Sequence, residues 1–122
     1  MSKLALQKEK MSREPQLAPE EILRLRRDAG DYFRALVEKY SKIMGLKYGR
    51  INITTAKKRF GSCNANGDIC FSYRLMLYPE AAREYVVVHE LAHIIELNHS
   101  KAFYAIVERY MPDYKERRKL LS

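Results

Sequence analysis

The 122-residue sequence predicts an α+β fold, and three observations indicate this class. Apolar residues recur every three or four positions between residues 22 and 44, as on one face of an amphipathic helix. From Tyr48 the period shortens to two, which is typical of strands. A third segment, residues 80–97, is apolar on nearly all sides and therefore predicts a buried helix. Helices and strands that occupy separate parts of a chain are typical of the α+β class.

The first helix is expected to begin at Pro19 and to end at Gly45. Proline fits the first helical turn, and a glycine readily adopts the left-handed conformation that terminates a helix. Gly30 lies inside this segment, where a glycine can weaken or bend the helix. Residues 1–16 are polar and aperiodic, so we expect a mobile leader followed by a single domain of residues 17–122.

Residues 50–56, 58–63 and 68–75 predict a small, mainly antiparallel sheet of about three strands. The dipeptide Asn66-Gly67 favours a two-residue hairpin turn, which would place Cys63 opposite Cys70. Two neighbouring thiols that pack in the sheet are favoured here over a redox or metal role, because no signal peptide directs the chain to an oxidising compartment.

The second half of the chain predicts three helices. Pro79 precedes the helix of residues 80–97, and Asn98 is expected to end it in the left-handed conformation. Ser100 can cap a helix over residues 101–111. Asp113 and Glu116 have the spacing of a capping box for a last helix over residues 114–121.

The buried helix carries the motif H-E-x-x-H, formed by His89, Glu90 and His93, and His99 follows closely. Residues i and i+4 of a helix are about 40° apart, so both imidazoles can reach one metal ion. Glu90 would lie beside that ion as a base for water, and His99 could supply a third ligand if the helix ends before it. Burial of these groups without partners would cost several kcal/mol, which favours metal binding over a chance motif.

Charge and hydropathy limit the partners. Lysine and arginine number 23 against 15 acidic residues, so the net charge is +8. This favours acidic partners, nucleic acid among them, although the basic residues are dispersed and solvated faces explain them equally well. No segment approaches the roughly 18 apolar residues of a membrane span, and a cytoplasmic protein with no membrane partner is expected.

Several stretches of the sequence resemble the YgjP-like metallopeptidases, which are relatives of the minigluzincins and of the SprT-like proteins. Phe60 and Tyr104 stand where the family usually has tryptophan, and the N-terminal β-rich half of many relatives is absent from this sequence. The matching stretches occur in the family's order and are KRFGSC (58–63), DI to RL (68–75), YVVVHELAH (85–93), NHS (98–100) with Phe103, and MPDYKE (111–116).

The resemblance implies a zincin-like fold, with the metal beneath an edge strand of the sheet. It also implies a zinc ion bound by His89, His93 and His99, with Glu90 as the catalytic acid and base. As the third ligand His99 ranks first, Glu108 second and Glu96 last, because the predicted break at Asn98 frees His99 to turn back.

The leading hypothesis is a zinc-dependent metallopeptidase that acts on a peptide or protein substrate. The strand of residues 68–75 is the candidate edge for an extended peptide, and Tyr104, Arg109 and Tyr110 are candidate donors to the oxyanion. One alternative is a SprT-like, nucleic-acid-associated protease or adaptor. Another is a non-catalytic, metal-stabilised binding domain in which Glu90 only supports a ligand.

Overall fold

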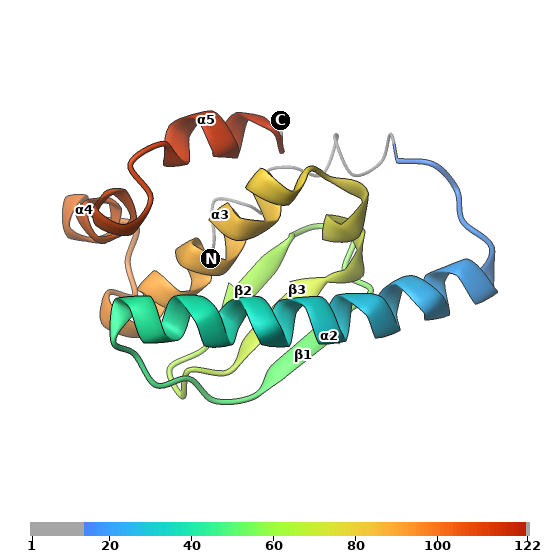
Figure 1. Ribbon diagram of the computed structural model, residues 1–122, viewed down its shortest axis with the longest axis horizontal. Helices are drawn as coiled ribbons and strands as arrows, with labels where there is room; N and C mark the ends of the chain where they lie inside the picture. The colour runs from blue at the N-terminus through green and yellow to red at the C-terminus, as the bar shows by residue number, and fades with distance from the viewer. Residues whose placement is uncertain (1–13, 122) are drawn as a thin grey trace.

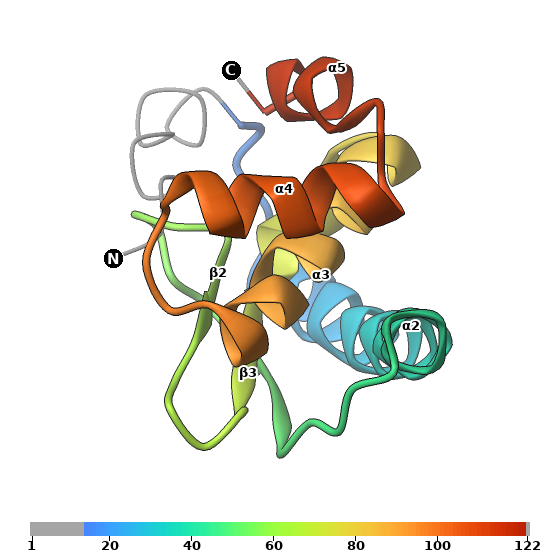
Figure 2. The same cartoon turned by 90° about the vertical axis from the view of Figure 1, so that its left-hand side faces the viewer.

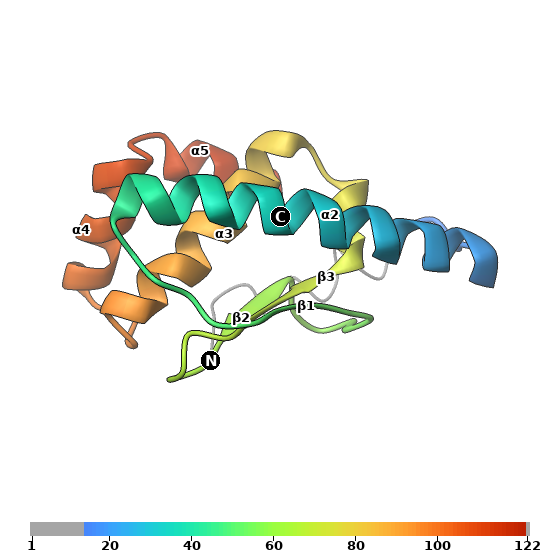
Figure 3. The same ribbon diagram turned by 60° about the horizontal axis from the view of Figure 1, so that its bottom comes forward.

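One face of a small mixed sheet carries two long helices (Figure 1, Figure 3). The computed structural model describes residues 14–121. Helices α4 and α5 lie on the side of α3 that faces away from α2 (Figure 2). The elements are, in chain order, α2 (Pro19–Met44), β1 (Ile51–Thr54), β2 (Gly61–Cys63), β3 (Ile69–Ser72), the 3-10 helix η2 (Tyr73–Leu77), α3 (Glu80–Ile95), α4 (Lys101–Tyr110) and α5 (Tyr114–Lys119).

The predicted first helix is confirmed as α2, and both of its predicted boundaries hold. Pro19 begins the helix, and the carboxylate of Glu21 accepts a hydrogen bond from the Ala18 N–H. Gly45 ends it with φ 68°, in the left-handed region. The helix runs through Gly30 without a break, so this glycine does not interrupt the segment.

The sheet has the strand order β1-β3-β2, so β3 is central. β1 pairs with β3 in parallel, and β2 pairs with β3 antiparallel. Ile69 and Phe71 point from β3 into the core, where Phe71 stacks on Phe33 of α2 with ring centroids 4.5 Å apart. The α+β class and the three-stranded sheet are confirmed, and the sheet is mixed rather than mainly antiparallel. The expectation that residues 68–75 form an edge strand is wrong, because β1 occupies the other side of β3.

The third strand is also shorter than predicted. It ends at Ser72, whose hydroxyl accepts a hydrogen bond from the Arg74 N–H and begins η2. A serine that caps the next turn offers the backbone an alternative to the strand ladder. The apolar residues that follow in η2 therefore continue the core on a helical turn.

The hairpin between β2 and β3 has a different register from the predicted one. Cys63 pairs with Ile69, and Ser62 pairs with Cys70. Gly67 has φ 80°, whereas Asn66 does not have the positive φ that a two-residue type I′ turn requires at both central positions. The side-chain oxygen of Asn64 accepts from the Asn66 and Asp68 N–H groups instead, which favours a longer loop.

Two predicted helix ends differ from the structure. α3 ends at Ile95, where Glu96 is extended with φ −137°, and Asn98 is not left-handed. The Asp113 side chain forms no cap on α5, because its carboxylate accepts a hydrogen bond from Nε of Arg117 at 3.0 Å. The predicted cap on α4 is confirmed, since the Ser100 hydroxyl accepts from the Phe103 N–H.

The predicted leader lies mostly outside the described residues, which begin at Glu14. The Glu14 carboxylate forms an ion pair with Arg74 at 3.1 Å and accepts a hydrogen bond from the Tyr78 hydroxyl at 2.6 Å. The start of the described chain is therefore attached to η2. Within residues 14–121, none of the helices combines the length and the hydropathy that a membrane crossing requires.

Candidate metal centre

The structure brings the three histidines of the chain together. His89 and His93 lie one turn apart on α3, and His99 returns to them from the segment between α3 and α4. One ring nitrogen from each lies within 4.8 Å of the other two. Nε2 of His89 and Nε2 of His99 are 3.3 Å apart. Two nitrogens on a tetrahedral zinc ion, at about 2.0–2.1 Å from it, are also about 3.3 Å apart.

Two hydrogen-bond partners fix how the rings point. The Tyr85 hydroxyl lies 3.1 Å from Nδ1 of His89, and the backbone carbonyl of Glu96 lies 3.2 Å from Nδ1 of His93. A carbonyl can only accept, so Nδ1 of His93 carries the proton and Nε2 presents a lone pair. Partners of this kind orient imidazole ligands in metal sites.

Burial favours the neutral, metal-binding form of these rings. His89 is fully buried and His93 is 6% exposed. Desolvation by burial lowers the pKa of His93, which disfavours the protonated imidazole. Phe103, placed by the capped start of α4, stacks on His93 with a centroid distance of 4.5 Å and meets His89 edge-on at 5.0 Å.

The donor set fits a metal ion. Three imidazoles suit zinc and other borderline transition metals, and three protein ligands leave one coordination position open. Within residues 14–121, the cluster with three suitable donors consists of the histidines, and neither Glu96 nor Glu108 belongs to it. Glu96 contributes its backbone carbonyl to His93 instead, and Glu108 is exposed on α4.

Glu90 is a residue of α3, and its fully buried side chain extends toward the edge strand β2. A Cβ placed on Gly61 would lie 3.1 Å from Oε2 of Glu90 and 3.2 Å from its Cγ. The missing side chain of Gly61 therefore makes the space in which this carboxylate lies. Gly61 was not among the predicted site residues, although its position within the family-like stretch 58–63 was a signal for it.

The two cysteines do not face each other as predicted. Cys63 shares the inward face of the sheet with Ile69, whereas Cys70 lies on the opposite face, because side chains alternate along a strand. Both are free thiols, and burial raises the pKa of Cys63 to about 11. A thiol that stays protonated at neutral pH is a poor nucleophile and a poor metal ligand.

Of the three candidate oxyanion donors, Tyr104 lies nearest to the histidines. Its ring stacks on His99 with a centroid distance of 6.3 Å and on Tyr114 at 5.9 Å. Arg109 is exposed and lies over the ring of Tyr110 at the end of α4. The contacts of these two residues therefore connect them to each other rather than to the histidine cluster.

Comparisons with known proteins point to a metallopeptidase. A family model described as "YgjP-like, metallopeptidase domain" matches residues 3–122. The fold is similar to that of the metallopeptidase zymogen abylysin from Pyrococcus abyssi, with a TM-score of 0.64 and 25% sequence identity. That match covers 71% of this chain and 89% of abylysin. A comparison with curated proteins finds no match.

Proposed function

We propose that this chain, which belongs to the YgjP-like metallopeptidase family, cleaves peptide bonds with a zinc ion held by His89, His93 and His99. The observation that carries the proposal is the position of three ring nitrogens within 4.8 Å of one another beside a buried glutamate. Zinc would supply Lewis-acid chemistry and lower the pKa of a water molecule toward about 7. The other steps of the reaction are proposed to depend on the protein's own residues.

Glu90 is the proposed general base and acid. Its carboxylate would take a proton from the attacking water and pass that proton to the leaving amine, which is the exchange that general acid–base catalysis requires. Burial beneath Gly61 supports this role, because a carboxylate shielded from bulk water exchanges protons with the substrate rather than with solvent.

The peptide substrate is proposed to lie along β2. This strand is an edge of the sheet, packs against α3 and passes directly over Glu90 at Gly61. An extended peptide that pairs with such an edge has its main chain held by hydrogen bonds. Tyr104, which stacks on His99, is the proposed donor to the developing oxyanion.

A Glu90→Gln variant tests the role of the glutamate. Glutamine has nearly the same size but cannot take a proton, so we expect unchanged zinc content and a loss of hydrolysis of about 10²–10⁴-fold on a peptide library. Glu108→Gln, on the exposed part of α4, is the matched control and should hydrolyse like the parent. Hydrolysis retained in Glu90→Gln would reject the proposed base. A zinc-loaded parent without any hydrolysis would favour the non-catalytic binding domain.

A further inference from the structure

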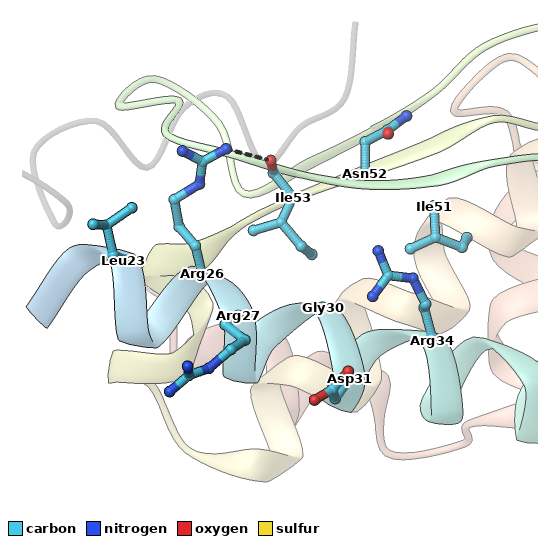
Figure 4. Close-up of a pocket in the computed structure, with 9 residues that line it drawn as sticks. All are labelled: Leu23, Arg26, Arg27, Gly30, Asp31, Arg34, Ile51, Asn52 and Ile53. Atoms are coloured by element: carbon cyan, nitrogen blue, oxygen red, sulfur yellow. Dashed lines mark hydrogen bonds between the residues drawn. The ribbon is translucent and has the colours of Figure 1, made fainter. Parts of the chain in front are cut away.

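A groove lies at the edge of the sheet opposite β2. It has a volume of about 350 Å³ and lies between one stripe of α2 and the edge strand β1 (Figure 4). We call it the arginine groove, because three of the side chains that line it are arginines. Its lining residues are Leu23, Arg26, Arg27, Gly30, Asp31, Arg34, Ile51, Asn52 and Ile53.

The register of the sheet turns the backbone of β1 toward this groove. The Ile69 N–H donates to the carbonyl of Arg50, so in the parallel ladder the even-numbered residues of β1 bond to β3. The N–H and C=O groups of Ile51 and Ile53 therefore point away from β3. Nη2 of Arg26 donates to the Ile53 carbonyl at 3.5 Å, which agrees with this orientation.

Two arginines extend from α2 toward that edge. Arg26 reaches Ile53 and Arg34 extends toward Ile51, whereas Arg27 extends away from the strand (Figure 4). Within residues 14–121, none of these three guanidinium groups forms a salt bridge. The lining also contains one acidic residue, Asp31, so three arginines against one carboxylate leave the groove with an excess of positive charge.

Gly30 lies between the two arginines and gives the groove its floor. A Cβ at this position would lie 2.8 Å from Nη1 of Arg34. A glycine inside a helix costs about 1 kcal/mol relative to alanine. The guanidinium is the far end of a flexible side chain and can move away from a Cβ, so a side chain at position 30 would enter the groove at little cost.

We infer that the arginine groove binds an acidic peptide segment in extended conformation, as a fourth strand beside β1. Such a strand can both accept from the outward N–H groups and donate to the outward carbonyls of Ile51 and Ile53, and its alternate side chains would face α2. Arg26 and Arg34 are eight residues apart on α2, which is about 12 Å along the helix axis. Same-face positions of a strand are about 6.6 Å apart, so two acidic residues four positions apart, about 13 Å, would meet the two arginines. Nucleic acid fits less well, because a phosphodiester backbone has acceptors for the arginines but no donor for the carbonyls.

Binding can be measured by fluorescence anisotropy with a labelled heptapeptide of alternating glutamate and valine. The protein is the full chain with Glu90→Gln, so that the probe is not cleaved. We expect binding that persists after the metal is removed with a chelator, which separates this groove from the metal centre. The lysine–valine analogue, and an acidic probe with every amide N-methylated, should bind at least tenfold more weakly. Equal binding of either control probe would overturn the inference.

Paired charge reversals locate the binding. Arg26→Glu with Arg34→Glu should raise the Kd at least tenfold. Arg24→Glu with Lys39→Glu, on exposed positions of α2 outside the groove, changes the net charge equally, from +8 to +4, and should raise it less than threefold. An equal effect of the two pairs would show attraction by net charge alone and would overturn the inference.

A variant without a charge change guards against misfolding. Gly30→Leu should fill the groove, keep the melting temperature at or above that of the parent, and weaken probe binding at least tenfold. Unchanged binding in Gly30→Leu would contradict the proposed location. A single-stranded oligonucleotide that displaces the probe, and that loses affinity in the Arg26/Arg34 variant, would assign the groove to nucleic acid and also overturn the inference.

Discussion

The two edge strands of the sheet border surfaces of opposite kinds. β2 lies over α3, where His89, Glu90 and His93 are buried and hydrogen-bond partners orient the rings of His89 and His93. β1 lies along α2, where the charged side chains are exposed to solvent and line an open groove. Buried groups with oriented partners are suited to chemistry, whereas exposed arginines beside a free strand edge are suited to binding. The two proposed tasks would therefore fall at opposite edges of one small sheet.

The largest effect should come from removing His99, the proposed zinc ligand that lies outside α3. Structural zinc sites with four ligands bind with about 10–16 kcal/mol, so the loss of His99 should lower zinc affinity by about a hundredfold to a thousandfold. Competition with a chelating dye would measure this in His99→Ala. Glu108→Ala and Glu96→Ala should bind zinc like the parent, and retention of zinc by His99→Ala while Glu108→Ala lost it would refute the ligand assignment.

The next effect, on the rate of hydrolysis, should come from filling the space between Gly61 of β2 and the Glu90 side chain. A Cβ at position 61 would lie 3.1 Å from Oε2 of Glu90, so in Gly61→Ala the carboxylate would have to move by a few tenths of an ångström. A displacement of about 1 Å can cost about a hundredfold in rate, so we expect a smaller decrease in kcat/KM, of up to about tenfold, with zinc content unchanged. Gly45→Ala is the control for a loss of stability alone. Its left-handed backbone makes alanine cost about 1–2 kcal/mol, but an added Cβ would have no neighbour within 4 Å, so the activity should not change. Full activity of Gly61→Ala would separate β2 from the function of Glu90.

Removing the hydrogen-bond partner of His89 should have a moderate effect on metal affinity. Tyr85→Phe removes the hydroxyl 3.1 Å from Nδ1 of His89 and leaves the aromatic ring in the core. Loss of such a partner lowers metal affinity by about 10–100-fold, and we expect the lower end because the buried ring remains. Isothermal titration with zinc would measure the change. Tyr110→Phe is a suitable control, and the same affinity in both variants would argue against an orienting role for Tyr85.

The smallest effect, on stability, should come from Asp68, which joins the loop between β2 and β3 to Arg50 at the start of β1. The Asp68 carboxylate accepts from the Arg50 N–H at 2.8 Å, and this hydrogen bond is the main cause that lowers the pKa of Asp68 below 3.8. Because the pKa of Asp68 is lower in the folded state than in the unfolded state, its carboxylate stabilises the fold at a pH above the unfolded-state pKa. This stabilisation is lost as the pH falls through the folded-state pKa. The melting temperature of the parent should therefore fall more between pH 5 and pH 3 than that of Asp68→Asn. If the melting temperatures of the two proteins changed equally with pH, the Asp68 carboxylate would make no contribution to stability through this hydrogen bond.

Local patterns predicted the helices and the histidine cluster because those features depend on residues close in sequence. The i and i+4 spacing of His89 and His93 fixes their common face, and Gly45 ends α2 through its own backbone freedom. The hairpin register was wrong because the side chain of Asn64 competes for the turn, which the Asn66-Gly67 dipeptide alone does not reveal.

Other features depend on contacts between distant segments. The central position of β3 follows from the parallel pairing with β1, and no local pattern encodes strand order. Gly61 matters because α3 places Glu90 beneath it, and the arginine groove joins residues 23–34 to residues 51–53. The dispersed positive charge in the sequence therefore did not indicate that two arginines converge on one strand edge.

The most direct test of the metal centre is X-ray absorption at the zinc edge on the purified, zinc-loaded protein. The proposed site predicts three imidazole nitrogens at about 2.0–2.1 Å and one further light-atom ligand. The His99→Ala protein should then show two imidazoles. A sulfur ligand, or a spectrum that His99→Ala leaves unchanged, would contradict the assignment of His89, His93 and His99 as the site that binds the metal.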